Sequence, residues 1–257
     1  MKSASFTAII ILLFASIGRA DPVTMRDIVA RECHRIGAKL GSVSYSECMA
    51  RDLKPSGGIS VKGTPILMKE YPPLKGRHPL GRVLLIGGDG LLQDHSTRTN
   101  AHGVDLNRNF PMPGWLQATR NYWINTTSKN PRHYPGPSPL SEPESWWLAN
   151  EIKTFSPDVI VTVHAPYGIV DYDGPKHAPH RLGRLYLNLL GTYPGSLGNY
   201  AGVQKQIPVV TIELPYAGIM PTPAEISAIW KDLIRWLSRN IPSPPVAGKN
   251  DQDTEPS

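Results

Sequence analysis

The chain has 257 residues, of which 40% are hydrophobic and 19% are charged, and its formal net charge is +6. This length is enough for one large domain with a sizeable core. The basic residues are spread along the chain without a run of five, which argues against a nucleic-acid partner, and beyond the N-terminus no apolar stretch is long enough to cross a membrane.

The first twenty residues are organised like a secretory signal peptide. Lys2 supplies a positive start, an apolar run covers 6–17, and small residues stand at the −3 and −1 positions of a cleavage site after Ala20. We therefore expect a mature chain that begins near Asp21 and whose net charge of +6 falls to +4 when Lys2 and Arg19 are removed. It is expected to be a periplasmic or secreted monomer that is not attached to a membrane.

An N-terminal helical segment is predicted over 21–54. Apolar residues recur at helical spacing within 25–52, and this segment contains Cys33 and Cys48, the only two cysteines of the chain. In an oxidising compartment such a pair is expected to form a disulfide that joins two short helices.

The segment 55–240 is assigned to one α/β domain. Its first part is predicted to contain a hairpin over 57–69, a short buried strand over 82–86 and a loop rich in proline and glycine over 111–140. Two further buried strands follow, DVIVTVH at 158–164 and PVVTIEL at 208–214.

Two capping-box sequences predict helices in the same domain. The first helix opens at 141–144 and ends near Phe155, and the second opens at 222–225. The apolar face of the second helix is predicted to consist of Ile226, Ile229, Trp230, Leu233 and Leu237.

Helices that alternate with continuously apolar strands predict an α/β fold, with a mostly parallel or mixed central sheet and helices on both faces. The segment 241–257 is polar and rich in proline, and we expect it to be a disordered tail.

Two ionisable residues end the buried strands, because His164 follows VIVTV and Glu213 follows VVTI. Ligands of open α/β sheets bind beyond the carboxyl ends of the strands, where a histidine can bind a metal and a glutamate can act as a general base. A third element, GVDLNRNFP, contains Asn107 and Arg108. The planar donors of a guanidinium group and a neighbouring amide suit a carboxylate.

Five motifs occur in the order GVDLNRNFP, YPGPSPLSEPES, VTVHAPYG, PGSLGNYAG and TIELP. With this combination the chain resembles the zinc carboxypeptidases of the carboxypeptidase A superfamily, and in particular the bacterial murein-peptide amidases. The resemblance covers roughly 55–240. It implies a zinc cofactor, hydrolysis of an amide bond, and a peptide substrate with a free carboxylate, with murein peptides of the cell wall as the expected class.

The resemblance also implies a role for each matching residue. Asn107 and Arg108 would hold the free carboxylate of the substrate, and Arg98, in STRTN, would polarise the scissile carbonyl. His164 would be the last zinc ligand, and Glu213 would be the base that takes a proton from zinc-bound water.

The chain departs from the family pattern at two places. Tyr193 resembles the mobile tyrosine that covers bound substrate, but its spacing to the PGSLG loop differs. The family also supplies two more zinc ligands from a His-x-x-Glu motif after the strand equivalent to 83–86, whereas this chain continues as IGGDGLLQDHSTRTN. We infer that a few dozen residues are missing between Gly88 and Asp89, and that two zinc ligands, one helix and one central strand are missing with them.

Three hypotheses follow from this pattern. The first is an exported zinc metallocarboxypeptidase or amidase whose metal site is completed by nearby residues such as Asp89, Asp94 and His95. The second is a catalytically inactive relative that still binds peptide carboxylates through Asn107 and Arg108. The third is a truncated gene product without a stable function.

Overall fold

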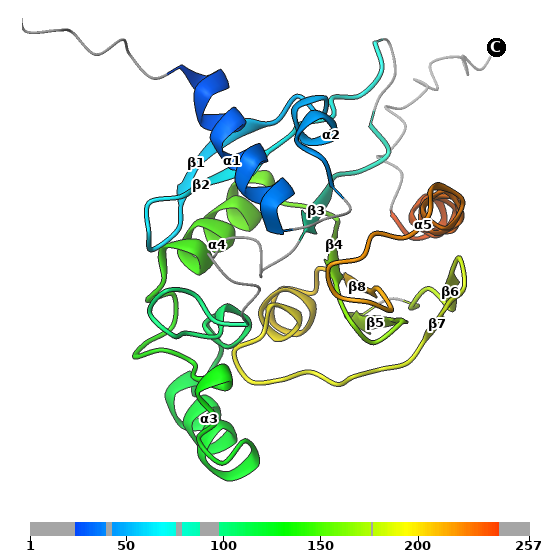
Figure 1. The fold of residues 1–257 in the computed structure, drawn as a ribbon. Helices are drawn as coiled ribbons and strands as arrows, with labels where there is room; N and C mark the ends of the chain where they lie inside the picture. The colour runs from blue at the N-terminus through cyan, green and yellow to red at the C-terminus, as the bar shows by residue number, and fades with distance from the viewer. Residues whose placement is uncertain (1–23, 40–42, 76–78, 88–97, 176, 242–257) are drawn as a thin grey trace, which may run out of the picture.

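A six-stranded mixed sheet forms the centre of the molecule, whose computed structural model describes residues 24–39, 43–75, 79–87, 98–175 and 177–241 (Figure 1). The strand order is β3-β4-β8-β5-β7-β6. The parallel strands are β3 (Val83–Gly87), β4 (Val159–His164) and β8 (Val209–Glu213). β5 (Ile169–Asp173) runs antiparallel to β8, and the short strands β7 (Leu185–Leu187) and β6 (Arg181–Leu182) follow it. The predicted mixed α/β fold is confirmed.

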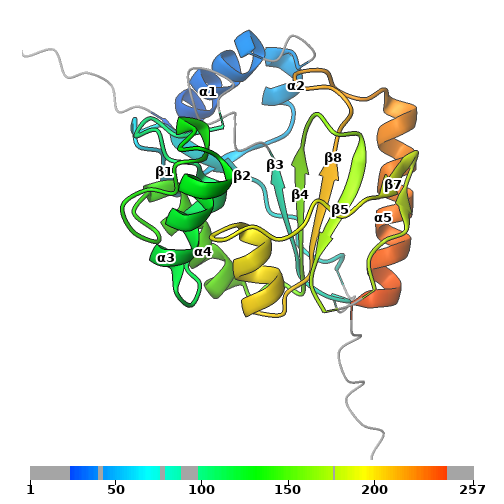
Figure 2. The same cartoon turned by 90° about the horizontal axis from the view of Figure 1, so that it is seen from below.

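Helices cover both faces of this sheet, as Figures 1 and 2 show. On one face α5 (Pro223–Asn240) packs through Leu233, Trp236 and Leu237 against alternate residues of β4, β5 and β8. On the other face α4 (Pro143–Phe155) and the π-helix η5 (Gly198–Gln204) share a second core with the remaining alternate residues. β4 is buried on both faces because every residue from Val159 to Val161 is apolar and fully enclosed.

The N-terminal part lies beside the sheet. It contains α1 (Met25–Lys39), α2 (Tyr45–Met49) and an antiparallel hairpin of β1 (Lys54–Ile59) and β2 (Pro65–Met68). A disulfide joins Cys33 of α1 to Cys48 of α2, so the predicted pair is connected. Both sulfurs are buried in a small core of their own.

β3 forms one edge of the six-stranded sheet. It pairs directly with β4 over five residue pairs, whereas the β1–β2 hairpin forms a separate two-stranded sheet. Leu85 of β3 is 55% exposed, although it belongs to an apolar strand. The strands therefore form a continuous sheet, as expected if β3 pairs directly with β4 in a chain that lacks one central strand. The junction at 88–97 lies outside the described residues.

The segment 111–140 is more ordered than predicted. It contains α3 (Trp115–Asn121), followed directly by the π-helix η3 (Tyr122–Thr126) and the short 3-10 helix η4 (Pro131–His133). The prolines that suggested a loop lie on either side of α3 and η3, at 111–113 and 131–139, and the stretch WLQATRN itself contains no proline or glycine to interrupt a helix. The prediction of a loop over the whole segment was wrong.

The two predicted capping boxes have different outcomes. Thr222 caps α5 and forms the reciprocal bonds with Glu225, as predicted. In α4 the N-cap is Glu142, with no side-chain cap, because Glu144 instead accepts a hydrogen bond from the backbone N–H of Val61 in the hairpin turn at 3.0 Å. That glutamate therefore connects α4 to the β1–β2 hairpin.

The buried face of α5 is rotated relative to the prediction. Ile226 and Trp230 are 44% and 53% exposed, whereas Trp236 is buried and donates a hydrogen bond from its indole N–H to the carbonyl of His177 at 3.0 Å. Helical periodicity alone allowed either face, and the packing of Trp236 decides between them.

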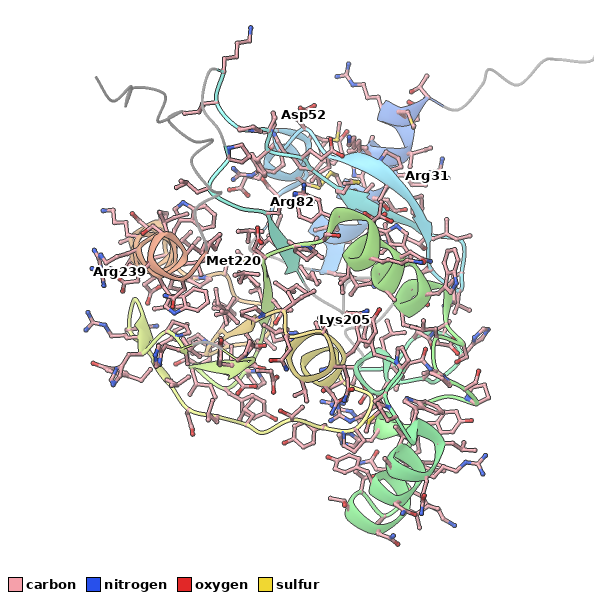
Figure 3. The ribbon with its side chains drawn as sticks, turned by 180° about the vertical axis from the view of Figure 1, so that it is seen from behind. Arg31, Asp52, Arg82, Lys205, Met220 and Arg239 are labelled. Carbon is pink, nitrogen blue, oxygen red and sulfur yellow. A yellow bond between two sulfur atoms is a disulfide. The ribbon has the colours of Figure 1, made fainter. Side chains whose placement is uncertain are left out.

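Charged side chains are distributed over the surface, from Arg31 on α1 to Arg239 on α5 (Figure 3). Within the described residues, no helix has both the length and the apolar character needed to span a membrane. The predicted signal peptide and nearly all of the predicted tail lie outside the described residues.

Candidate functional site

A cavity of about 620 Å³ opens at the carboxyl ends of β4 and β8. Residues from β3, β4, β5, β8, α4 and the irregular segments 98–110 and 190–198 line it. All six predicted site residues belong to this lining, and they are Arg98, Asn107, Arg108, His164, Tyr193 and Glu213. The structure thus brings together motifs that lie more than a hundred residues apart in the chain.

His164 and Glu213 lie side by side at the strand ends. They are register partners in the parallel β4–β8 pair, so their side chains project from the same face of the sheet into the cavity. Two residues earlier on each strand, and on the same face of the sheet, the Thr162 hydroxyl donates a hydrogen bond to the Thr211 hydroxyl at 2.9 Å. Glu213 is only 6% exposed.

Arg108 is a buried cation that faces the same cavity. Its residue is 3% exposed, and its guanidinium carbon lies 4.6 Å from the ring centre of Tyr193 and 5.4 Å from that of Tyr122. Nη1 donates to the Asn107 carbonyl at 2.5 Å, whereas Nε has no hydrogen-bond partner in the described part of the chain. Buried donors are almost always satisfied, so this guanidinium is prepared for an anionic ligand.

The loop 193–197 holds the carboxylate-binding residues in place. The Leu197 N–H donates to Oδ1 of Asn107 at 2.8 Å, and the Phe110 N–H donates to the Gly195 carbonyl at 2.9 Å. Because Oδ1 of Asn107 is used in this way, its Nδ2 group is oriented as a donor, and it makes no hydrogen bond to the described residues. Tyr193 donates its hydroxyl to the Leu190 carbonyl at 3.0 Å, which fixes its ring over Arg108.

Asn109, which follows Arg108, fixes the position of the 107–109 segment through the hydrogen bonds of its side-chain amide. It is fully buried, and its Nδ2 group lies 2.9 Å from the carbonyls of Pro135 and Ser138 and 3.1 Å from the Ser141 hydroxyl. Its Oδ1 accepts a hydrogen bond from the Ser145 hydroxyl at 2.5 Å. This amide therefore positions Arg108 by connecting its backbone to the start of α4.

Arg98 lines the cavity and forms a salt bridge with Asp105. Its Nε donates to Oδ2 of Asp105 at 2.8 Å, and Asp105 is 1% exposed. The other oxygen of Asp105 accepts from the Asn107 N–H at 3.1 Å. Asp105 therefore connects Arg98 to Asn107.

Asp171 and Asp173 of β5 also line the cavity, and sequence reasoning did not single them out. Burial raises the pKa of Asp173, a hydrogen bond from the Thr192 hydroxyl opposes this shift, and the nearby charge of Asp171 raises the pKa further. The sequence pattern that could have identified them is IVDYD, in which the two acids are two residues apart and therefore lie on one face of a strand.

The described donors do not fit a catalytic zinc ion. Such an ion needs three protein ligands and an open position. Among the residues that the structure describes, no group of three His, Cys, Asp or Glu side chains could hold a metal. Asp89, Asp94 and His95 lie outside the described residues.

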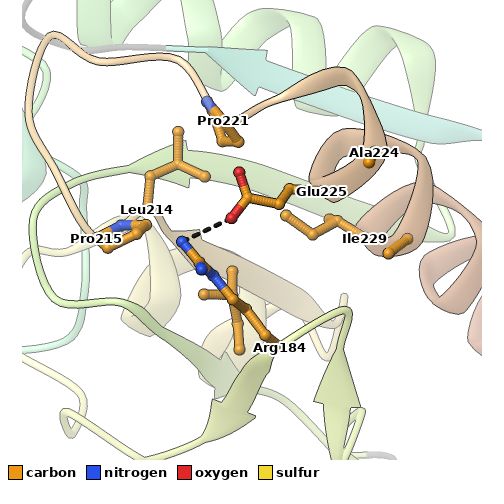
Figure 4. Close-up of a pocket in the computed structure, with 9 residues that line it drawn as sticks. Arg184, Leu214, Pro215, Pro221, Ala224, Glu225 and Ile229 are labelled. Atoms are coloured by element: carbon orange, nitrogen blue, oxygen red, sulfur yellow. Dashed lines mark ion pairs between the residues drawn. The ribbon is translucent and has the colours of Figure 1, made fainter.

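A second, smaller cavity of about 240 Å³ lies on the α5 side of the sheet. Figure 4 shows its apolar wall, which includes Leu214, Pro215 and Ile229, and the ion pair between Arg184 and Glu225 across its opening. The two charged groups are 2.7 Å apart. Because its charges are already paired, it has less capacity for polar ligands than the larger cavity.

Comparison with known proteins shows which family part of the larger cavity resembles. Residues 89–172 match the zinc carboxypeptidase family. In this segment the chain is similar to the zinc carboxypeptidases. The matched segment contains Arg98, Asn107, Arg108 and His164, and it begins directly after Gly88, where the sequence indicates a missing segment. The predicted resemblance to this family is confirmed.

Murein peptide amidases are among the similar proteins. Murein peptide amidase A of Escherichia coli (strain K12) is 27% identical over 188 residues, which cover 69% of this chain and 74% of that protein. Its counterpart in Vibrio campbellii is 32% identical over 126 residues, covering 46% of this chain and 50% of that protein. The crystal structure of a murein-tripeptide amidase from Escherichia coli O157 is 21% identical with a TM-score of 0.44, covering 74% of this chain and 91% of that structure.

Proposed function

We propose that this protein is an exported relative of the murein-peptide amidases that captures cell-wall peptides by their free carboxylate. One observation carries the proposal: Arg108 is 3% exposed, faces the cavity, and has an Nε donor without a partner among the described residues. Asn107 supplies an amide donor beside it. A carboxylate between these two groups would accept from the buried Nε donor of Arg108 and from the amide donor of half-buried Asn107.

Two features support a murein peptide as the ligand and an extracytoplasmic location. Proteins that share 27% and 32% of their aligned residues with this chain are murein peptide amidases. The first twenty residues also have the charge, apolar run and cleavage site of a secretory signal. A cavity lined by both acidic and basic groups suits a peptide that carries several charges.

Titration calorimetry with the tripeptide L-Ala-γ-D-Glu-meso-diaminopimelate tests this proposal. Replacing Arg108 by alanine is expected to weaken binding by roughly 2–5 kcal/mol, because the ligand carboxylate would be buried without its cation. Arg120→Ala, which removes an exposed arginine of α3, is the matched control and should leave the affinity unchanged. Equal affinities of the folded Arg108→Ala and Arg120→Ala variants would refute the carboxylate site.

Amide hydrolysis is a second candidate function. It is favoured by the register pairing of His164 with Glu213, which places an imidazole and a shielded carboxylate together at the cavity. Zinc content of the folded, dialysed protein and mass spectrometry of the incubated tripeptide test it. Turnover that is lost in Glu213→Gln while binding persists would support hydrolysis, and an intact tripeptide would leave binding as the function.

A further inference from the structure

The larger cavity extends across the sheet, from the β5 side, where Arg108 lies, to the β3 edge. At the β5 side the loop 190–198 is bonded to the strand through Leu190 and Asp171, and Tyr193 of this loop stacks on Arg108. At the other end β3 itself contributes to the lining. Since the strand order is β3-β4-β8-β5 and neighbouring strands lie about 4.8 Å apart, the two ends are separated by about 14 Å.

The end of the cavity at β3 has apolar walls, and we call it the apolar arm. Its side chains are Ile36 from α1, Leu53 from the segment before β1, Ile66 and Leu67 from β2, Ile86 from β3 and Leu148 from α4. Ile36, Leu53 and Leu67 also pack against the core around the disulfide, whereas Ile86 and Leu148 pack against the core beneath α4. The arm therefore lies between two separate cores, each of which supports one of its walls.

The charged side chains that α1 and α4 contribute to this lining already have partners. Arg35 of α1 forms a salt bridge with Glu32, in which the two charged groups are 2.7 Å apart. Glu144 of α4 accepts the Val61 N–H at 3.0 Å. The arm thus offers aliphatic surface beside polar groups that are already bonded, and an aliphatic group fits it better than another charge does.

Most of the apolar arm is built by parts of the chain outside the segment that matches the zinc carboxypeptidases. That segment is 89–172, whereas α1, β2 and β3 all precede it. The disulfide between Cys33 and Cys48 joins α1 to α2 and so fixes the helix that carries Ile36. The family match therefore gives no role to this wall, although it belongs to the same cavity as Arg108.

We propose that the apolar arm binds an aliphatic group on the amino side of the ligand residue whose carboxylate is held by Arg108. A span of about 14 Å corresponds to roughly four extended residues, which is longer than any amino-acid side chain, so the group must be reached through the main chain or an N-acyl chain. This inference rests on the proposed function, because it takes the carboxylate at Arg108 as the fixed end. It adds a requirement for an apolar terminus and assigns Ile36 and Leu148 as specificity residues.

Two N-acyl amino acids that differ only in acyl length test the proposal with the full chain. Nα-acetyl-L-lysine and Nα-octanoyl-L-lysine share the free carboxylate, and only the second carries a long aliphatic tail. In titration calorimetry we expect the octanoyl compound to bind at least tenfold more tightly, since each buried CH₂ group tightens binding about fourfold.

Variants on both walls assign this preference to the arm. Ile36→Ser and Leu148→Ser should each reduce the preference for the octanoyl compound by at least about threefold and leave the affinity for the acetyl compound unchanged. Met25→Ser is the matched control, because Met25 lies on the same helix as Ile36 and is 65% exposed. It should keep the wild-type preference, and circular dichroism confirms folding of each variant.

The outcomes separate this inference from the proposed function. Equal wild-type affinities for the two compounds, both lost in Arg108→Ala, would overturn the apolar arm and leave the carboxylate site standing. A preference for the octanoyl compound that persists in both folded serine variants would also overturn the arm. Binding of neither compound, or binding that Arg108→Ala does not change, would overturn both proposals.

Discussion

Gly195 lies at the closest backbone contact of the candidate site, and replacing it by alanine should disrupt the loop that carries Tyr193. Its φ of +71° is a left-handed conformation that costs a residue with a Cβ about 1–2 kcal/mol. The new Cβ would also overlap the backbone carbonyl of Arg108, which cannot rotate away as a side chain could. Such overpacking typically adds about 1–3 kcal/mol, so we expect Gly195→Ala to lower the free energy of unfolding by about 2–5 kcal/mol in total.

Gly191→Ala is the matched control for this prediction. Gly191 has a similar φ of +88°, but a Cβ there would meet nothing within 4 Å, so only the conformational cost of about 1–2 kcal/mol applies. Urea unfolding monitored by circular dichroism measures both variants, and titration with Nα-acetyl-L-lysine measures the effect on the site. Equal destabilisation by the two substitutions, or unchanged binding by Gly195→Ala, would show that the 193–197 loop does not hold Arg108 as described.

Three further perturbations follow from the structure. Asn109→Ala should destabilise the protein by about 1–3 kcal/mol in urea unfolding, because it leaves the buried carbonyl of Pro135 without its donor, and a loss below about 1 kcal/mol would contradict the anchoring role. Thr222→Ala should cost about 1 kcal/mol by removing the N-cap of α5, and unchanged stability would argue against that cap. Asp173→Asn should stabilise the protein at neutral pH, because the pKa of Asp173 is raised in the folded state. The folded protein therefore binds this proton more tightly than the unfolded chain does. As a result, the stability of the wild type falls as the pH rises from the unfolded pKa to the folded pKa. The advantage of this variant should therefore disappear below the unfolded pKa, and an advantage independent of pH would contradict the assigned cause.

The sequence was most informative where residue type and periodicity agree. The apolar runs ending in His164 and Glu213 predicted two buried strands whose ends lie at a ligand-binding edge, and the structure adds that the two residues are register partners. The Thr222 capping box was predicted for the same reason, since its two partners are three residues apart and need no tertiary contact.

Features that depend on tertiary contacts could not be predicted. Ser141-Glu-Pro-Glu144 has the same local pattern as the Thr222 box, yet Glu144 is used by the Val61 N–H of a distant hairpin. The stacking of Tyr122 on Arg108 depends on helix η3, which the surrounding prolines and glycines concealed. Asp171 and Asp173 were not singled out because β5 is short and has acids at alternate positions, so its apolar signal is weak.

The central claim is that the cavity binds a free carboxylate at Arg108. The most direct test compares the affinity of the wild-type protein for Nα-acetyl-L-lysine with its affinity for Nα-acetyl-L-lysinamide, in which the carboxylate is replaced by an uncharged amide. We predict that the amide binds at least tenfold more weakly, since the buried guanidinium loses its charged partner. Equal binding of the two compounds would contradict the account, because the ligand would then be held without the carboxylate that Arg108 is positioned to receive.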